Sequence, residues 1–165
     1  MLRKHADFCV LFFVSFEVGH SMKIAVIDGQ GGGIGRHITT ALRERLPEDV
    51  KIYGLGTNAI AMGAILKGGA NEAAAGENAV CYMASRVDLI VGTAAILLSG
   101  SMCGEVSPAM VAAVGESPAK KILLPINRSG LTIVGVQAEP VPHQIEHLVD
   151  TVEEMYFKKH GKGAE

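Results

Sequence analysis

The chain has 165 residues, of which 48% are hydrophobic and 5% aromatic, and its formal net charge is −2. This length and apolar content fit a single compact domain with a hydrophobic core. The near-neutral charge excludes the basic surface by which proteins bind nucleic acid. The scarcity of aromatic residues argues against a surface that stacks bases or sugars.

Residues 1–21 are predicted to be either a start-site extension or a cleaved leader. Residues 8–16 form an apolar run that follows two basic residues, as in a signal peptide, but the run is too short to span a bilayer. The first core strand begins directly after Met22, which favours translation from Met22 in the cytoplasm. We expect one Rossmann-like nucleotide-binding domain over 22–157 and a flexible tail over 158–165.

A strand over 23–28 runs directly into a glycine loop, Gly29–Gly35, which contains five glycines. An amphipathic helix follows, with apolar residues at i, i+4 spacing: Ile34, Ile38, Leu42 and Leu46. A tight glycine turn between a strand and a helix N-terminus is the usual cradle for a phosphate. Its ligand is therefore predicted to be a small phosphorylated molecule.

The rest of the chain alternates apolar strands with helices. Strands are predicted over 50–55, 88–91 and 122–126, and helices over 59–67, 78–86, 108–114 and from Pro142, with a polar loop over 71–78. A turn at 127–130 leads to a last strand over 131–136, which should be antiparallel. The predicted fold class is α/β, a doubly wound, mostly parallel Rossmann-like sheet with an antiparallel edge strand.

Ligands of such sheets bind beyond the carboxyl ends of the strands, at a topological switch point. The candidate cofactor-binding residues at that edge are Asp28, Gly29, Gln30, Gly31, Gly32, Gly33, Ile34, Gly35, Thr57, Asn58, Gly92 and Thr93. The five loop glycines are expected to bind the anion. Asp28, Asn58 and Thr93 are expected to contact a ribose or base. Asn127 should lie at the same edge.

The spacing Gly29-x-x-x-Gly33-x-Gly35 resembles the cofactor loop of short-chain dehydrogenases. That resemblance implies NAD or NADP as the cofactor. The second strand ends in residues 55–58, which include no acidic residue to bind a ribose, so a different nucleotide is the alternative. The expected function is a small NAD(P)-dependent oxidoreductase or, alternatively, a non-catalytic nucleotide-sensing module that acts as a homo-oligomer. No catalytic residue is assigned.

Two strings imitate catalytic motifs without their context. Tyr82 and Arg86 imitate the Tyr-x-x-x-Lys pair of short-chain dehydrogenases, but they precede the strand that the pair should follow. His143 and His147 match a zinc-protease string, yet they fall on the solvated face of the last helix and lack a third ligand. No metal site is predicted. The three cysteines are widely spaced and are expected to be reduced and buried.

Two carboxylates leave several roles open. Asp28 ends a buried strand beside the loop, where its charge would repel a phosphate. It is expected to bind a ribose hydroxyl, to hold a metal that accompanies the phosphate, or to accept a hydrogen bond from the loop. Glu105 precedes the Ser107 helix cap and is expected to favour a helix N-terminus or to act in the chemistry.

From Met22 to about Val136 the chain resembles an uncharacterised bacterial family, a domain of unknown function (DUF3842). The resemblance rests on residues 23–35 together with Gly56-Thr57-Asn58-Ala59-Ile60, Gly76-Glu77-Asn78-Ala79 and the string from Ser101 to Pro108. It implies a small Rossmann-like protein of the bacterial cytosol. The family supplies no known reaction, so the ligand is left open.

Overall fold

The structure is a computed structural model that describes residues 21–126 and 130–161. Its elements in chain order are β1 (Lys23–Asp28), α1 (Gly33–Arg45), β2 (Lys51–Gly56), α2 (Ala59–Lys67), β3 (Glu72–Ala75), α3 (Glu77–Ala84), β4 (Leu89–Thr93), the short 3-10 helix η1 (Ala94–Leu97), α4 (Pro108–Glu116), β5 (Lys120–Leu124) and α5 (Val141–His160). Except for Ser21, the predicted leader lies outside the described residues, as do the turn residues 127–129. The end of the predicted tail, from 162 to 165, is also outside them.

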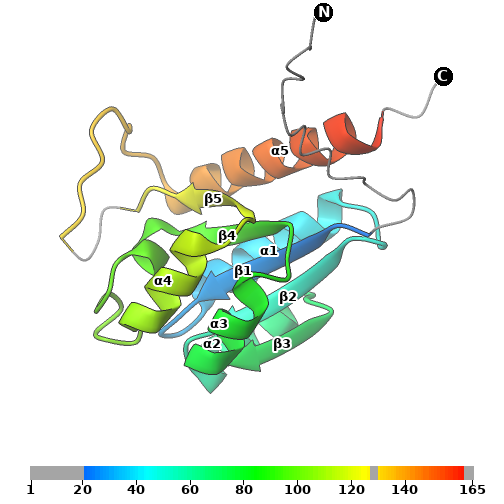
Figure 1. Cartoon of the computed structure of the whole chain (residues 1–165). Helices are drawn as coiled ribbons and strands as arrows, with labels where there is room; N and C mark the ends of the chain where they lie inside the picture. The colour runs from blue at the N-terminus through cyan, green and yellow to red at the C-terminus, as the bar shows by residue number, and fades with distance from the viewer. Residues whose placement is uncertain (1–20, 127–129, 162–165) are drawn as a thin grey trace, which may run out of the picture.

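The five strands form one sheet in the order β3-β2-β1-β4-β5, and every neighbouring pair is parallel. The chain leaves β1 toward β2 and β3 and later returns to the other side of β1, so the switch point lies between β1 and β4. Figure 1 shows the sheet as the middle layer, with helices on both of its faces. The α/β expectation is therefore confirmed.

The predicted antiparallel strand over 131–136 is absent from the described residues, and this prediction was wrong. Gly130 and Gly135 both have positive φ, 76° and 86°, so the backbone turns where an extended strand was expected. Val134 is 95% exposed and packs against no core. In Figure 1 this segment loops away from the sheet, between β5 and α5.

The predicted polar loop over 71–78 was also wrong, because it contains β3. This strand has the sequence Glu-Ala-Ala-Ala and pairs with β2 from Tyr53↔Glu72 to Gly56↔Ala75. None of its residues is β-branched or aromatic, so propensity gave no sign of a strand. Pairing with the neighbouring strand determines the structure here.

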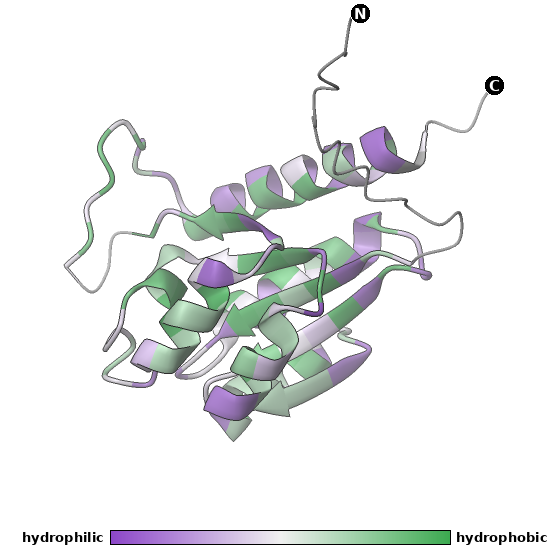
Figure 2. Ribbon diagram, viewed as in Figure 1, coloured by the Kyte–Doolittle hydropathy of each residue, from purple (hydrophilic) through white to green (hydrophobic). Residues whose placement is uncertain are grey.

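Two hydrophobic cores flank the sheet because successive residues of a strand point to opposite faces. Ile24 and Val26 of β1 belong to the core beneath α1, α2 and α5, whereas Ala25 and Ile27 belong to the core beneath α3 and α4. In Figure 2 the strands are mostly green, in keeping with burial on both faces. This packing fixes the ends of β1 and β4, which carry the candidate site.

The helices differ in how their N-termini are capped. The side chain of Asn58 accepts a hydrogen bond from the backbone of Ala61 at the start of α2, and Ser107 does the same for Met110 in α4. The cap of α1 is Gly32, which has no side chain and adopts a left-handed conformation. The first turn of α1 is therefore not capped by its own N-cap residue.

Candidate functional site

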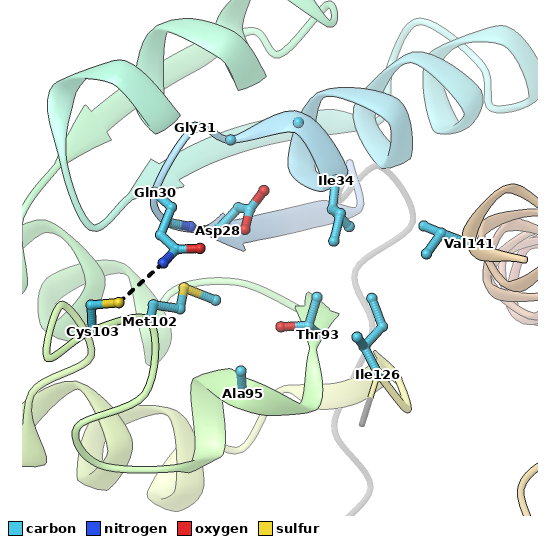
Figure 3. A pocket seen from close by; sticks show the side chains of 13 residues that line it. Asp28, Gln30, Gly31, Ile34, Thr93, Ala95, Met102, Cys103, Ile126 and Val141 are labelled. Carbon is cyan, nitrogen blue, oxygen red and sulfur yellow. Dashed lines mark hydrogen bonds between the residues drawn. The ribbon is translucent and has the colours of Figure 1, made fainter. Parts of the chain in front are cut away.

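A cavity of about 520 Å³ lies at the switch point, beyond the carboxyl ends of β1 and β4. Its lining comprises Asp28, Gly29, Gln30, Gly31, Gly32, Gly33, Ile34, Thr93, Ala95, Met102, Cys103, Ile126 and Val141. Figure 3 shows these residues around the space between the glycine loop and the 3-10 helix that follows β4. Its volume lies within the usual range for small-molecule sites.

The N–H groups of the glycine loop divide into two sets. Four are used within the protein: those of Gly29 and Gly35 donate to Asp28, that of Gln30 donates to Glu105, and that of Gly32 donates to the carbonyl of Gly29. The N–H groups of Gly31, Gly33 and Ile34 donate to no described residue. The last two belong to the first turn of α1 and point out of its positive end.

The sign of φ alternates along the loop. Gln30 and Gly32 have positive φ, 50° and 68°, whereas Gly31 between them does not. Anion-binding nests are built from successive residues of right- and left-handed backbone. The loop shares the alternation in the sign of φ with such sites.

The loop glycines differ in what requires them. A Cβ at Gly32 would lie 2.6 Å from the Cα of Ala61, and a Cβ at Gly35 would lie 2.8 Å from the Cβ of Asp28. At Gly31 and Gly33 a Cβ would meet nothing within 4 Å, and neither residue has positive φ. No contact or backbone angle of the described protein requires glycine at these two positions, and both line the cavity.

Thr93 provides an unpartnered polar group in the same cavity. The residue is 5% exposed, and its Oγ1 is buried without a hydrogen-bond partner among the described residues. Figure 3 shows this oxygen directed into the pocket. A buried hydroxyl without a protein partner is unfavourable, so this oxygen is available to bond a molecule in the cavity.

Asp28 caps the glycine loop from inside. Its two oxygens accept hydrogen bonds from Gly29 and Gly35, at 2.8 and 2.7 Å. Burial raises the pKa of its carboxyl above the ordinary value, although the two N–H groups oppose the shift and nearby Glu105 adds to it. Of the roles left open by the sequence, the structure brings out the hydrogen bond to the loop.

Glu105 binds the other side of the loop. Its Oε2 accepts hydrogen bonds from the backbone N–H of Gln30 at 2.8 Å, from the amide of Asn58 at 2.9 Å and from the hydroxyl of Thr57. These bonds, that from Gln30 most of all, lower the pKa of its carboxyl. The residue therefore joins the loop after η1 to the ends of β1 and β2.

The candidate residues from the sequence are not all brought together. Asp28 to Ile34 and Thr93 line one cavity. The side chains of Thr57 and Asn58 are bound to Glu105 instead, and Gly35 lies behind Asp28. Gly92 pairs with Ile27 inside the sheet, where a Cβ would lie 2.6 Å from the carbonyl oxygen of Ile27.

Several lining residues were missed from the sequence. Met102 and Cys103 belong to the loop after η1 and have positive φ, 54° and 58°. With Gln30 they are the non-glycine residues of the described chain that adopt this strained conformation, and all three line the cavity. Cys103 is exposed, contrary to the expected burial, and its sulfur accepts a hydrogen bond from Gln30 at 3.6 Å.

The motif-like strings lie away from this cavity. Arg86 stacks on the exposed ring of Tyr82 at 3.8 Å from its centre, and neither residue lines the pocket. His147 is 3.4 Å from the carboxylate of Glu139. The described residues contain no group of three or more His, Cys, Asp or Glu side chains arranged to hold a metal ion.

A protein-family model matches most of the chain. The family described as "Domain of unknown function (DUF3842)" matches residues 23–157, which include the whole sheet and the glycine loop. The chain belongs to this family. The family indicated by the sequence motifs is thereby confirmed, and its match extends beyond them to α5. No curated protein matches the chain.

One solved structure among those that match is titled "Crystal structure of universal stress protein in complex with cAMP". Its sequence is 20% identical to this chain, and the TM-score is 0.35. The matched region spans 63% of this chain and 97% of the universal stress protein. A similarity at this level carries no argument about the ligand of this chain. Separately, none of the helices in the described residues has the length and apolar character needed to cross a membrane.

Proposed function

We propose that this protein binds a nucleotide through its phosphate, which accepts hydrogen bonds from the backbone N–H groups of Gly31, Gly33 and Ile34. The observation that carries the proposal is that these three groups line a cavity and lack partners among the described residues. Gly31 and Gly33 are exposed and Ile34 is half-buried, so these donors are accessible from the cavity, and the positive end of α1 favours an anion there. The unpartnered Thr93 hydroxyl supplies a second polar contact in the same cavity.

The nearby carboxylates are compatible with an anion. Both oxygens of Asp28 already accept hydrogen bonds from the N–H groups of Gly29 and Gly35, so the carboxyl is held against the inside of the loop. Glu105 is ionised at neutral pH, but its charge is bound on the β2 side of the loop by three donors. The residues with free N–H groups line the cavity together with Thr93 of β4, and Glu105 does not line it.

The lining favours binding over a redox reaction. Among its described members, Asp28 and Cys103 are the titratable side chains, and both carboxylate oxygens of Asp28 are engaged by the loop. The described lining contains no His, Lys or Tyr that could offer a proton to a reacting group. Of the two expected roles, the non-catalytic nucleotide-sensing module is therefore the better supported, with an NAD(P)-dependent oxidoreductase as the alternative. Homo-oligomer formation and a cytoplasmic location remain parts of this proposal.

The test is a thermal-shift and calorimetry series with sulfate, AMP, ATP and NAD⁺ on the purified protein and two variants. In Gly33→Val the new side chain meets no protein atom close to its Cβ, so the free protein should unfold near the wild-type temperature. The same side chain occupies the space of the phosphate, and affinity should fall by about 100-fold or more.

The matched control is Gly115→Val in α4, where a Cβ also meets nothing within 4 Å and which lies outside the cavity. This variant should bind like the wild type. Equal binding by Gly33→Val and the wild type would overturn the proposed site. No stabilisation of the wild type by any of the four compounds would overturn the function itself.

A further inference from the structure

The carboxyl end of β1 lies between β2 and β4, and the space for a ligand differs between these two sides. In sheets of this topology a dinucleotide places its pyrophosphate on the glycine loop and its adenosine ribose at the end of β2. Here the end of β2 is followed by Thr57 and Asn58, whose side chains donate to Glu105. The polar groups that a ribose would use are therefore already occupied.

We infer that Glu105 is a specificity-determining residue that closes the β2 side of the site, so that the protein takes a mononucleotide and rejects a dinucleotide. This inference rests on the proposed function, since it concerns the ligand of the same glycine loop. Glu105 acts by position: a single carboxylate oxygen spans the glycine loop and the residues after β2 through three hydrogen bonds.

Close packing around Gly29 supports the closure. A Cβ built on Gly29 would lie 2.6 Å from the sulfur of Met102 and 2.8 Å from Oε2 of Glu105. The side of Gly29 that faces Thr57 is therefore filled by Met102 and Glu105, while the cavity lies on the other side of these residues. A ribose and base could reach the end of β2 only if that segment moved away.

The open space extends in the other direction. The cavity continues from the free N–H groups past Thr93 to apolar side chains, of which Ile34, Ile126 and Val141 lie near one another in Figure 3. Thr57, Asn58 and Glu105 are not among its lining residues. A phosphate on the loop thus leaves room on the β4 side for one nucleoside, with its base against the apolar residues.

The carboxylate of Glu105 is already in use. In sheets that bind NAD, an acidic residue at the end of β2 accepts hydrogen bonds from the ribose hydroxyls. Here Oε2 of Glu105 already accepts three hydrogen bonds from Gln30, Thr57 and Asn58. The anion of a mononucleotide meets instead the positive end of α1.

The experiment compares AMP with NAD⁺ by isothermal titration calorimetry on the wild type, Glu105→Ala and the control Glu116→Ala at the exposed end of α4. The wild type should bind AMP at least about 10-fold more tightly than NAD⁺. Glu105→Ala releases the loop, Thr57 and Asn58, so it should raise the affinity for NAD⁺ by about 10-fold and change that for AMP by less than about 3-fold. Glu116→Ala should keep the wild-type ratio.

Three outcomes decide the matter. Wild-type protein that binds NAD⁺ as tightly as AMP would overturn the inference and leave the phosphate site intact. A folded Glu105→Ala protein with an unchanged ratio of AMP affinity to NAD⁺ affinity would also overturn it. If that variant does not fold, Glu105→Gln replaces it. This variant keeps a single acceptor oxygen and should move the ratio in the same direction by a smaller factor. Failure of both ligands to bind the wild type would instead remove the proposed function on which the inference rests.

Discussion

The glycine loop has two sides that differ in how their polar groups are used. On the β2 side, the N–H of Gln30 and the side chains of Thr57 and Asn58 all donate to Glu105. On the β4 side, the N–H groups of Gly31, Gly33 and Ile34 and the hydroxyl of Thr93 lack described partners. One loop therefore combines a closed, structural half with an open half.

The glycines follow the same division. Those on the closed side, Gly29 and Gly56, are packed so tightly that a Cβ would overlap their neighbours. Those on the open side, Gly31 and Gly33, have free space where a Cβ would lie. A glycine required by packing says nothing about a ligand, whereas the missing side chains of Gly31 and Gly33, which line the cavity, leave room for a ligand to approach the backbone.

The largest expected effect comes from filling the closed side. In Gly56→Ala the new methyl group would overlap backbone atoms of Met62 and Asn58, which cannot move without disturbing the start of α2. We expect the free energy of unfolding to fall by about 3 kcal/mol and the melting temperature by roughly 10 °C. Urea denaturation and calorimetry measure both.

The control for this change is Gly31→Ala on the open side. Because its Cβ meets no atom within 4 Å, stability should change by less than about 0.5 kcal/mol. Equal destabilisation by the two substitutions would show that the two sides do not differ in packing, and the comparison would fail.

Much of the fold could be predicted from the sequence. The bounds of β1 and α2 are the predicted ones, and α4 starts after Ser107 as its cap and proline indicate. These elements carry local signals in apolar periodicity and capping residues. β3 was missed because its small residues carry no such signal. The segment 131–136 was wrongly assigned as a strand because its apolar residues suggested one, whereas in the described structure it pairs with none of the five strands.

The site divides in a similar way. Strand, loop and helix order identified the residues from Asp28 to Ile34, because all the information is local. The bond between Gln30 and Glu105 joins residues 75 positions apart, so no local pattern predicts it. The same holds for Met102 and Cys103, whose left-handed backbone has no glycine to mark it. The sequence therefore identified Gln30, Thr57, Asn58 and Glu105 as residues of interest, but it did not predict the hydrogen bonds that join them.

A smaller effect should come from the unpartnered hydroxyl on the open side. Thr93→Val removes a buried oxygen that makes no bond in the free protein, so stability should stay the same or rise by about 1 kcal/mol. AMP affinity should nevertheless fall by about 5-fold, because the ligand loses a hydrogen-bond partner. Thermal unfolding with and without AMP separates the two effects.

The matched change on the closed side is Thr57→Val. There the hydroxyl donates to Glu105, so its removal should lower stability and leave AMP affinity nearly unchanged. Loss of stability in Thr93→Val would mean that its hydroxyl has a partner within the protein. It would then no longer indicate a ligand.

The smallest effect is a pH dependence that arises from Asp28. Burial raises its pKa above 3.8, so between that value and the folded pKa the folded protein holds a proton that the unfolded chain releases. This contribution to stability is complete below pH 3.8 and is lost as the pH rises through the folded pKa. Over the same range the newly ionised carboxylate begins to repel an anion on the neighbouring N–H groups.

Sulfate is the suitable probe because it keeps its charge throughout this range. Its affinity should weaken by about 3-fold as the pH rises through the folded pKa of Asp28. The pKa of Glu105 is lowered from 4.5, so above that value Glu105 stays ionised and adds no pH dependence of its own. Asp28→Asn, which keeps one acceptor for the loop, should bind sulfate with a flat pH profile. A flat profile in the wild type would place the anion too far from Asp28 to be on the open side of the loop.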